Sequence, residues 1–436
     1  MDRILQYVRW RGDLPLSPED FCLADNLVLS ALSYLKFPSV DWETARPTLK
    51  ECVQQAEQAG GLQMLTTETN EEMYDFVRAA ARSERFGRLF VRDYVDAYYP
   101  EGPVQFSAVT FWLDEKTSYV AFRGTDNSLA GWKEDFMIAF TRTKAQSLAA
   151  EYLNHAVQPG QQYYVGGHSK GANLALYAAA VLPPEQRTGL KRIFVNDGPG
   201  FCGEVLDLAL LDGISSLITL VQPVFSVVGQ LFTPEAADRY IVNSSARGLM
   251  QHSIFSWGVA YGELDTAPEF DAGSLWLRQV LDRWVSSMPI EERENATEQL
   301  FEALSQNGAE RLSDLTEHAP ETLERFIATA RQFDPSTKNA LKKLPAAAIQ
   351  TGSPELDLKT VLQMQKKRSK FREGISLAET ILLGVLSLLL LIFPTLYAGL
   401  YIPVVVFLVL LVLIRLLLLV FSKKGEKMEE KEKTGP

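Results

Sequence analysis

The chain has 436 residues, enough for more than one domain, with 43 Lys and Arg against 54 Asp and Glu and a net charge of −11. This acidic balance excludes a protein whose main task is to wrap nucleic acid. The mean hydropathy of −0.04 is typical of a soluble protein, but it averages two dissimilar parts of the chain. Three cysteines without a CxxC pair indicate a reducing compartment and offer no structural zinc site.

The sequence before the apolar C-terminal runs predicts an α/β fold. Residues 1–85 are mostly helical in pattern, with apolar residues at helical spacing over 25–35. Residues 104–122 change to β-rich runs, and 114–116 form the turn of a predicted hairpin. Short apolar strands separated by helical stretches follow at 163–165, 192–195, 217–221 and 239–242. This alternation predicts a largely parallel sheet, and 263–365 is predicted as an acidic helical segment.

Two apolar runs occur near the end of the sequence, at 375–393 and 404–421. As helices they are about 27–29 Å long, close to the hydrocarbon thickness of a bilayer. Pro394, Gly399 and Pro403 interrupt the chain between them, so we expect a transmembrane helical hairpin. The hairpin and its basic collar occupy 366–421, and a charged tail follows at 422–436. The positive-inside rule places both ends in the cytoplasm, and a re-entrant hairpin would give the same sidedness.

Residues 167–171 read Gly-His-Ser-Lys-Gly, which is the G-x-S-x-G pattern of a nucleophile elbow. A β-rich run precedes the pattern and an Ala- and Leu-rich helical stretch follows it. An elbow holds its serine in a strained turn, and Gly167 and Gly171 leave room for the close approach of the backbone. Ser169 is therefore the candidate nucleophile. The alternative is a structural glycine-rich turn.

A serine nucleophile needs a base, and the sequence offers four histidines: His155, His168, His252 and His318. The chain order serine, acid, histidine of α/β-hydrolases excludes His155, and His168 is part of the elbow itself. His318 lies in the acidic helical segment and is expected at the surface. His252 follows the last predicted strand and is the candidate base.

The acid that would orient this base has two candidate positions. Asp197 follows the strand 192–195, although it could instead cap the Gly-Pro-Gly turn that comes next. More usually the acid follows the next strand, and the residues there offer only Ser226. Either Asp197 completes a triad, or a polar side chain that is not an acid orients His252.

An oxyanion hole would complete the site. Its first donor should be the main-chain N–H of Lys170, directly after the serine. The second should come from a loop after an early strand, where the N–H of Thr125, with its hydroxyl, would face the developing negative charge. Asp126 and Asp135 are predicted as local hydrogen-bonding and turn residues.

These motifs resemble those of a known family. Phe-Arg-Gly-Thr-Asp at 122–126 and the Gly-His-Ser-Lys-Gly elbow resemble the class 3 (fungal-type) lipases of the α/β-hydrolase fold. Asp-Gly-Pro-Gly-Phe at 197–201 and Gln-His-Ser at 251–253, with Trp257, resemble a bacterial, largely uncharacterised lipase-related subgroup. The resemblance spans about 20–262, within a domain at 1–262, and implies Ser169 as nucleophile, His252 as base and Thr125 in the oxyanion hole. The sequence departs from the family at Ser226, where a carboxylate is usual.

Together these features predict a membrane-anchored serine hydrolase that cleaves carboxylic esters of membrane lipids or other acyl groups. Its place would be the bacterial cell membrane, with the catalytic domain facing the cytoplasm. The alternatives are a non-catalytic membrane adaptor that retains the fold, or a short-chain esterase or thioesterase. Residues 201–235 are expected to form either a lid or acyl-binding wall, or ordinary packing helices. We expect no cofactor, no metal and no nucleic-acid partner.

Overall fold

A seven-stranded sheet forms the centre of the structure, and its strands lie side by side in chain order from β1 to β7. The computed structural model describes residues 3–42, 44–66, 69–99, 104–125, 133–134, 136–305, 329 and 332–351, all within the first of two compact units. The first three strands are antiparallel, and β3 to β7 are parallel. Their bounds are β1 (Phe90–Tyr99), β2 (Val104–Trp112), β3 (Thr117–Phe122), β4 (Gln162–His168), β5 (Leu190–Asn196), β6 (Ile218–Pro223) and β7 (Asp238–Val242).

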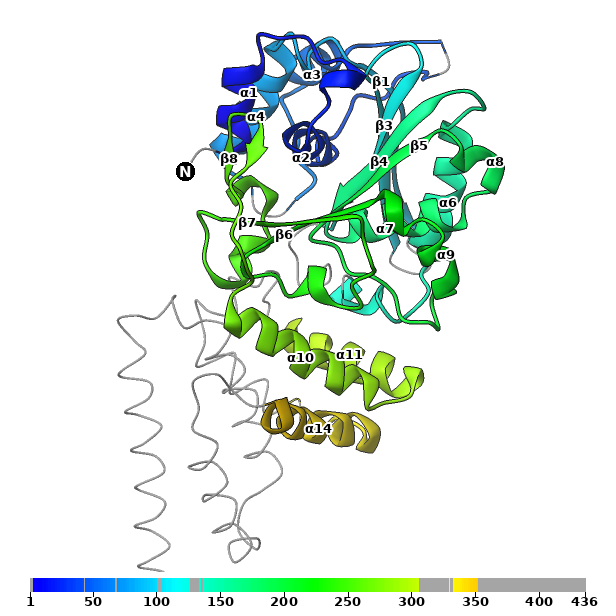
Figure 1. Cartoon of the computed structure of the whole chain (residues 1–436), viewed down its shortest axis with the longest axis vertical. Helices are drawn as coiled ribbons and strands as arrows, with labels where there is room; N and C mark the ends of the chain where they lie inside the picture. The colour runs from blue at the N-terminus through cyan, green and yellow to red at the C-terminus, as the bar shows by residue number, and fades with distance from the viewer. Residues whose placement is uncertain are drawn as a thin grey trace, which may run out of the picture. The chain divides into compact units, whose positions relative to one another are not determined.

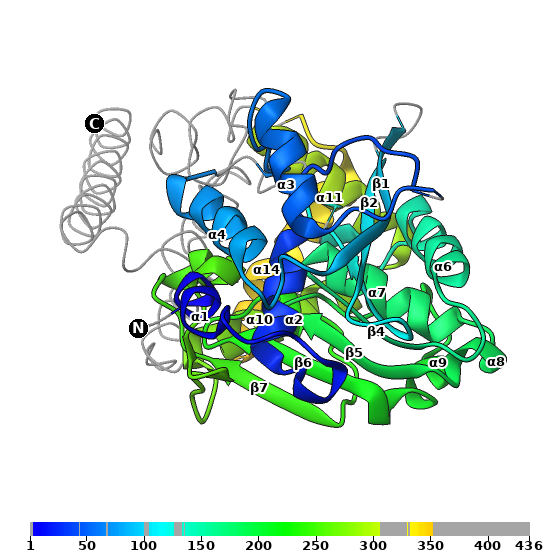
Figure 2. The same ribbon diagram turned by 90° about the horizontal axis from the view of Figure 1, so that it is seen from above.

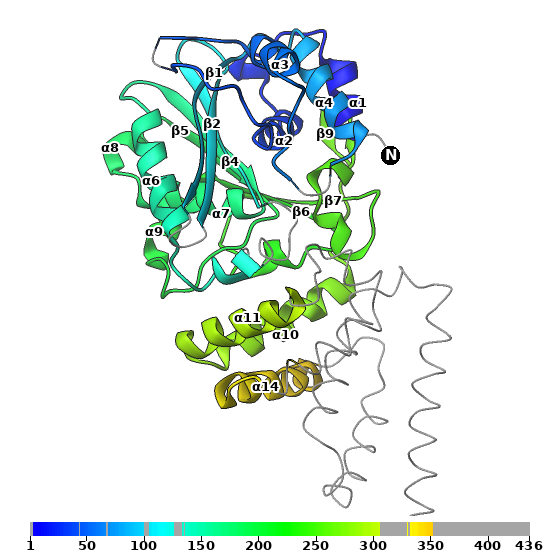
Figure 3. The same cartoon turned by 180° about the vertical axis from the view of Figure 1, so that it is seen from behind.

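Helices cover both faces of this sheet (Figures 1 and 3). One face carries α1 (Ile4–Arg11), α2 (Leu23–Leu32), α3 (Leu49–Gln58) and α4 (Glu71–Arg82), and Figure 2 shows the other three arranged around α2. The opposite face carries α6 (Lys144–Ala156) and α7 (Lys170–Val181), with the short α8 (Pro184–Arg187) and α9 (Leu208–Asp212) beside them. A mostly parallel sheet between two helical layers is the arrangement of an α/β-hydrolase, as the sequence predicts.

The predicted hairpin and the four later strands are confirmed, each within a few residues of its expected bounds. Strand β1 is not among the strands predicted from the sequence, because its residue pattern is irregular. A β-bulge lies between Arg92 and Val95, and Asp93 inside it has a φ of 56°. The bulge breaks the period-two alternation, and the charged residues of this edge strand hide it further.

Residues 201–235, expected to form either a lid or acyl-binding wall, or packing helices, contain the strand β6 together with α9 and two short 3₁₀ helices. Their apolar side chains are mostly buried, including Phe201, Val205, Leu206, Leu211 and Ile214. This burial is the arrangement that the packing interpretation describes.

The described part of 263–365 is helical apart from its first residues. It contains α10 (Ala272–Ser286), α11 (Ile290–Ser305) and α14 (Pro335–Thr351), and both α10 and α11 pack against α14 (Figure 1). The indole nitrogen of Trp284 donates to the Ala340 oxygen at 2.8 Å, joining α10 to α14. The Thr141 hydroxyl donates to Glu294 at 2.8 Å, which joins α11 to the sheet domain.

The predicted hairpin at 366–421 and the tail at 422–436 lie outside the described residues. No helix within the described ranges combines the length and the apolar composition needed to cross a membrane. The hairpin therefore stays a prediction from the two apolar runs.

A buried ion pair holds α2 to the end of α4. The Arg85 guanidinium donates to both carboxylate oxygens of Asp25, at 2.7 and 2.6 Å, and the two side chains are 1% and 0% exposed. The Tyr7 hydroxyl donates to the same carboxylate at 2.8 Å. Burial raises the pKa of Tyr7 well above its usual value, and the Asp25 charge adds to this, so the hydroxyl keeps its proton. One carboxylate thus links α1, α2 and the segment after α4.

Candidate active site

The elbow places Ser169 between the end of β4 and the start of α7. Its backbone has φ 59° and ψ −128°, a conformation that residues other than glycine rarely adopt. The Ser169 N–H donates to the Asn196 oxygen at 3.0 Å, which holds the turn against the end of β5. A strained residue between strand and helix is the geometry expected of a nucleophile elbow.

The two flanking glycines are needed because other backbone segments lie directly against them. A Cβ on Gly167 would come within 2.5 Å of the Phe122 oxygen, and a Cβ on Gly171 within 2.1 Å of the same atom. The end of β3 therefore packs against both sides of the turn. Any larger residue would push β3 and the elbow apart.

Gly171→Ala is expected to lower the free energy of unfolding by about 1–3 kcal/mol, because the new methyl group overlaps main-chain atoms. Urea denaturation would measure the change. Gly203→Ala is the matched control, since a Cβ at Gly203 has nothing within 4 Å. Equal stabilities of the two variants would contradict the close packing at the elbow.

His252 lies within hydrogen-bond distance of two other predicted site residues, Ser169 and Asp197. His252 Nε2 is 2.8 Å from Ser169 Oγ, and His252 Nδ1 is 2.6 Å from Asp197 Oδ2. A carboxylate only accepts, so Nδ1 carries the hydrogen and Nε2 is left to accept from the serine hydroxyl. The three residues are 3%, 8% and 1% exposed, in the order serine, histidine, aspartate. His252 belongs to the short 3₁₀ helix η4 (Gly248–His252) after β7.

Asp197 and Ser226, the two alternatives for the acid, lie together. Asp197 follows β5 with a φ of 49°, and its N–H donates to the Val221 oxygen at 2.8 Å. Ser226, beyond β6, donates its hydroxyl to Asp197 Oδ1 at 2.5 Å. The carboxylate therefore uses one oxygen for Ser226 and the other for His252. The structure places Asp197, not Ser226, directly against the imidazole.

The two predicted oxyanion donors also come from the segments that meet at Ser169. Lys170 begins α7, so its N–H belongs to the first turn of that helix. Its side-chain ammonium donates to Glu134 at 2.8 Å and to the Gln105 oxygen at 3.1 Å. Thr125 follows β3 and is 6% exposed. The residue before it is Gly124, and a Cβ added there would lie 3.2 Å from Ser169 Cβ, so this loop runs close to the serine. Asp126 and Asp135 lie outside the described residues.

Two further histidines, His155 and His168, lie in the described part of the chain. His155 is on α6 and exposed, and His318 lies outside the described residues. His168 is buried and bonded to Tyr34 and to the His252 main chain. Tyr34 is not among the residues predicted from the sequence, because it lies 134 residues before His168 and no local pattern marks it.

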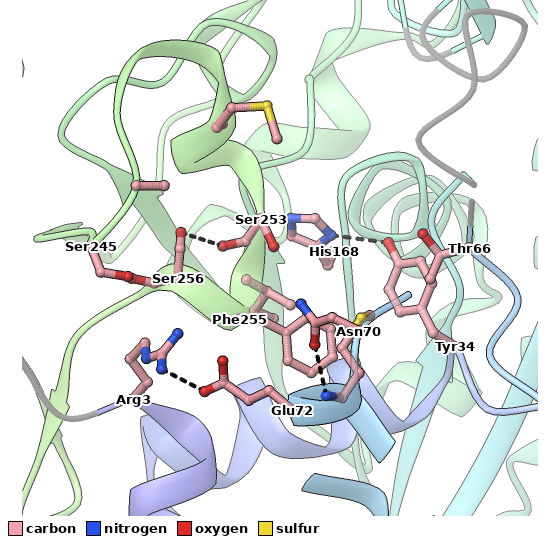
Figure 4. Close-up of a pocket in the computed structure, with 14 residues that line it drawn as sticks. Arg3, Tyr34, Thr66, Asn70, Glu72, His168, Ser245, Ser253, Phe255 and Ser256 are labelled. Atoms are coloured by element: carbon pink, nitrogen blue, oxygen red, sulfur yellow. Dashed lines mark hydrogen bonds and ion pairs between the residues drawn. The ribbon is translucent and has the colours of Figure 1, made fainter. Parts of the chain in front are cut away.

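A cavity of about 320 Å³ lies beside Tyr34 and His168 (Figure 4). Tyr34 and His168 form part of its wall, together with Ser253 and Phe255 from the loop after His252. The Arg3 and Glu72 ion pair, 2.6 Å long, lies at another part of the wall. The volume is at the lower end of the range for small-molecule pockets, about 300–1,000 Å³. Among the residues that the structure describes, no cluster of His, Cys, Asp or Glu could hold a metal ion.

Comparison with known proteins gives the family. A family model described as Mbeg1-like matches residues 80–302, slightly more than half of the chain. The chain belongs to the Mbeg1-like family. The matched region includes the elbow, Asp197 and His252, whereas α1 to α3 and Tyr34 precede it. This Mbeg1-like chain has the fold of an α/β-hydrolase, and its assignment to the class 3 lipases stays a prediction.

A search of solved structures found a similarity to one described as "Crystal structure of M37 lipase". The identity is 13% and the TM-score 0.29, and the match covers 47% of this chain and 68% of that one. No curated protein matches the chain.

Proposed function

We propose that this Mbeg1-like protein is a serine hydrolase of carboxylic esters. The observation that carries the proposal is the continuous hydrogen-bonded series from Asp197 through His252 to Ser169. A series of this kind turns a weakly nucleophilic hydroxyl into one that can attack an acyl carbonyl, because the imidazole takes its proton as the bond forms. A lipase-like fold supports the same conclusion.

The reaction would proceed in two halves. Ser169 Oγ attacks the carbonyl carbon, and His252 Nε2 takes the hydroxyl proton while Asp197 stabilises the imidazolium. The N–H groups of Lys170 and Thr125 stabilise the tetrahedral oxyanion. The imidazolium then returns its proton to the departing alcohol, which leaves an acyl-enzyme. Water, deprotonated by His252, hydrolyses the acyl-enzyme and restores the free serine.

We further propose that the protein is held at a membrane through the apolar runs at 375–393 and 404–421, with lipid esters as its substrate class. The proposal rests on the length and apolarity of those runs and on their basic flanks. A helical anchor would keep the enzyme where lipid esters are concentrated. Alkaline carbonate extraction of membranes from cells that express the full chain tests this. Release of the protein into the soluble fraction would contradict it.

A fluorophosphonate probe tests the serine mechanism, because it reacts covalently only with an activated serine. We expect the full-length protein to be labelled, and Ser169→Ala to remain folded but unlabelled. Hydrolysis of p-nitrophenyl esters of increasing acyl length would then separate a lipase from a short-chain esterase or thioesterase. Failure of the folded wild-type protein to react would favour the adaptor alternative.

A further inference from the structure

His168 lies next to the nucleophile, yet the proposed reaction does not use its ring. Its Nε2 is 2.7 Å from the main-chain oxygen of His252, and its Nδ1 is 3.0 Å from the Tyr34 hydroxyl. A carbonyl oxygen only accepts hydrogen bonds, so Nε2 carries a hydrogen. Burial lowers the pKa of His168 well below its usual value, and the neighbouring His252 lowers it further. The ring is therefore neutral, and Nδ1 accepts the hydrogen of the Tyr34 hydroxyl.

The main chain around the base is held by a second aromatic donor. The indole nitrogen of Trp257 donates to the Gln251 oxygen at 2.7 Å. Trp257 is fully buried, and its ring meets that of His168 edge to face, with 5.8 Å between centroids. Two successive carbonyl groups, those of Gln251 and His252, thus each accept a hydrogen bond from a buried ring N–H.

These hydrogen bonds matter because Tyr34, His168 and the residue after His252 are not packed against other side chains on every side. Tyr34 and His168 both line the cavity of about 320 Å³, as Figure 4 shows, and so does Ser253, which follows the base directly. Side chains that face a cavity lack contacts on that side, so packing does less to prevent them from moving. The bond from His168 to the His252 oxygen, and the bond between His168 and Tyr34, therefore restrain these groups on the side that faces the cavity.

We propose that Tyr34 and His168 are positioning residues of this hydrolase. Tyr34 orients the His168 ring, and His168 fixes the main chain of His252 so that its Nε2 stays within reach of Ser169. This inference rests on the proposed ester hydrolysis. It assigns a role to a residue just after α2, which lies before the region that the family model matches. A misplacement of about 1 Å in a catalytic group can cost about 10²-fold in rate, so a small loss of order here is measurable.

Tyr34→Phe tests the role of the hydroxyl in the full-length protein. With p-nitrophenyl butyrate as substrate, we expect kcat to fall about tenfold and KM to stay within about twofold. The matched control is Tyr163→Phe, since the Tyr163 hydroxyl likewise donates one 3.0 Å hydrogen bond, to the main-chain oxygen of Gln186 rather than to a ring nitrogen, and far from the site. This control should keep the wild-type kcat. Equal kcat values for the two variants, with equal melting temperatures, would overturn the proposal.

A pair of substitutions at His168 provides a second test. Gln can still donate a side-chain N–H to the His252 oxygen, whereas Leu of similar size cannot. We expect His168→Gln to retain at least about tenfold more activity than His168→Leu. Equal activities of the two variants at equal stability would show that the bond to His252 does not position the base.

Imidazole ¹⁵N NMR tests the hydrogen bonds of His168 separately from ester hydrolysis, so the positioning role and the hydrolase function can fail independently. It needs no substrate, and we expect the wild-type His168 to show the Nε2–H tautomer. Tyr34→Phe should shift the His168 and His252 signals, and Tyr163→Phe should not. If the wild-type protein proves unreactive to esters and to fluorophosphonate, the hydrolase proposal fails, while the NMR result still reports on the hydrogen bonds. Unchanged signals in Tyr34→Phe would overturn the positioning role.

Discussion

Asp197→Asn is expected to lower kcat for ester hydrolysis by about 10⁴-fold, with KM changed much less. The reason is the way in which Ser226 fixes the side chain. Because the Ser226 hydroxyl donates to one oxygen of the carboxylate, the amide oxygen of an Asn should face Ser226 and the amide NH₂ should face His252. His252 Nδ1 must then accept, and Nε2 must carry the hydrogen. An imidazole in that tautomer cannot take the proton of Ser169.

Steady-state kinetics with p-nitrophenyl butyrate measures this loss, and Asp212→Asn, an exposed position, is the control. If Asp197→Asn retains activity within a few-fold of the wild type, the acid is assigned wrongly. An exchange variant sharpens the test, since the two side chains lie 2.5 Å apart. The double variant Asp197→Ser with Ser226→Asp should be at least about tenfold more active than Asp197→Ser alone. The reason is that a carboxylate attached after β6 would fill the space of the one removed after β5.

Asp25→Asn is expected to lower the free energy of unfolding by about 3–5 kcal/mol, because it leaves the Arg85 guanidinium buried without a countercharge. Arg85 is 1% exposed, so solvent cannot replace the lost carboxylate. The Tyr7 hydroxyl also loses a charged acceptor. Urea denaturation followed by tryptophan fluorescence measures the change.

Glu84→Gln is the control for this ion pair, because Glu84 pairs with Arg88 at the surface and both side chains are largely exposed. Its loss should cost no more than about 1 kcal/mol. Asp25→Asn combined with Arg85→Met should be more stable than Asp25→Asn alone, since the unpaired charge is removed. A loss in Asp25→Asn no larger than that in the control would contradict the importance of the buried pair.

The elbow and the parallel strands could be predicted from the sequence because each is encoded locally. Residues 167–171 contain the serine and both glycines, and the β-rich run and the Ala-rich helix stand directly beside them. The later strands are short apolar runs bounded by polar segments, so their alternation is visible without any knowledge of contacts. The bulged edge strand β1 could not be predicted in this way, since its pattern is broken where Asp93 turns to a positive φ.

The sequence also narrowed the base to His252, because few histidines are available and their chain order excludes others. It left the acid open between Asp197 and Ser226, which are 29 residues apart. In the structure the two side chains bond to each other, and of the two it is the carboxylate that contacts the imidazole. Which of these two residues contacts His252 depends on how far β5 and β6 extend and on where their ends meet.

The sequence by itself therefore determined the fold class, the nucleophile turn and the candidate base, because these depend on local pattern and on composition. Only the tertiary structure decided which oxygen contacts His252, and that Tyr34 bonds to His168 across 134 residues of sequence. It also paired Asp25 with Arg85, 60 residues apart. Such pairs leave no periodic trace, because each is a single contact made where separate elements pack together. The contact of Tyr34 with His168, for example, depends on the packing of α2 against β4, the strand that ends at His168.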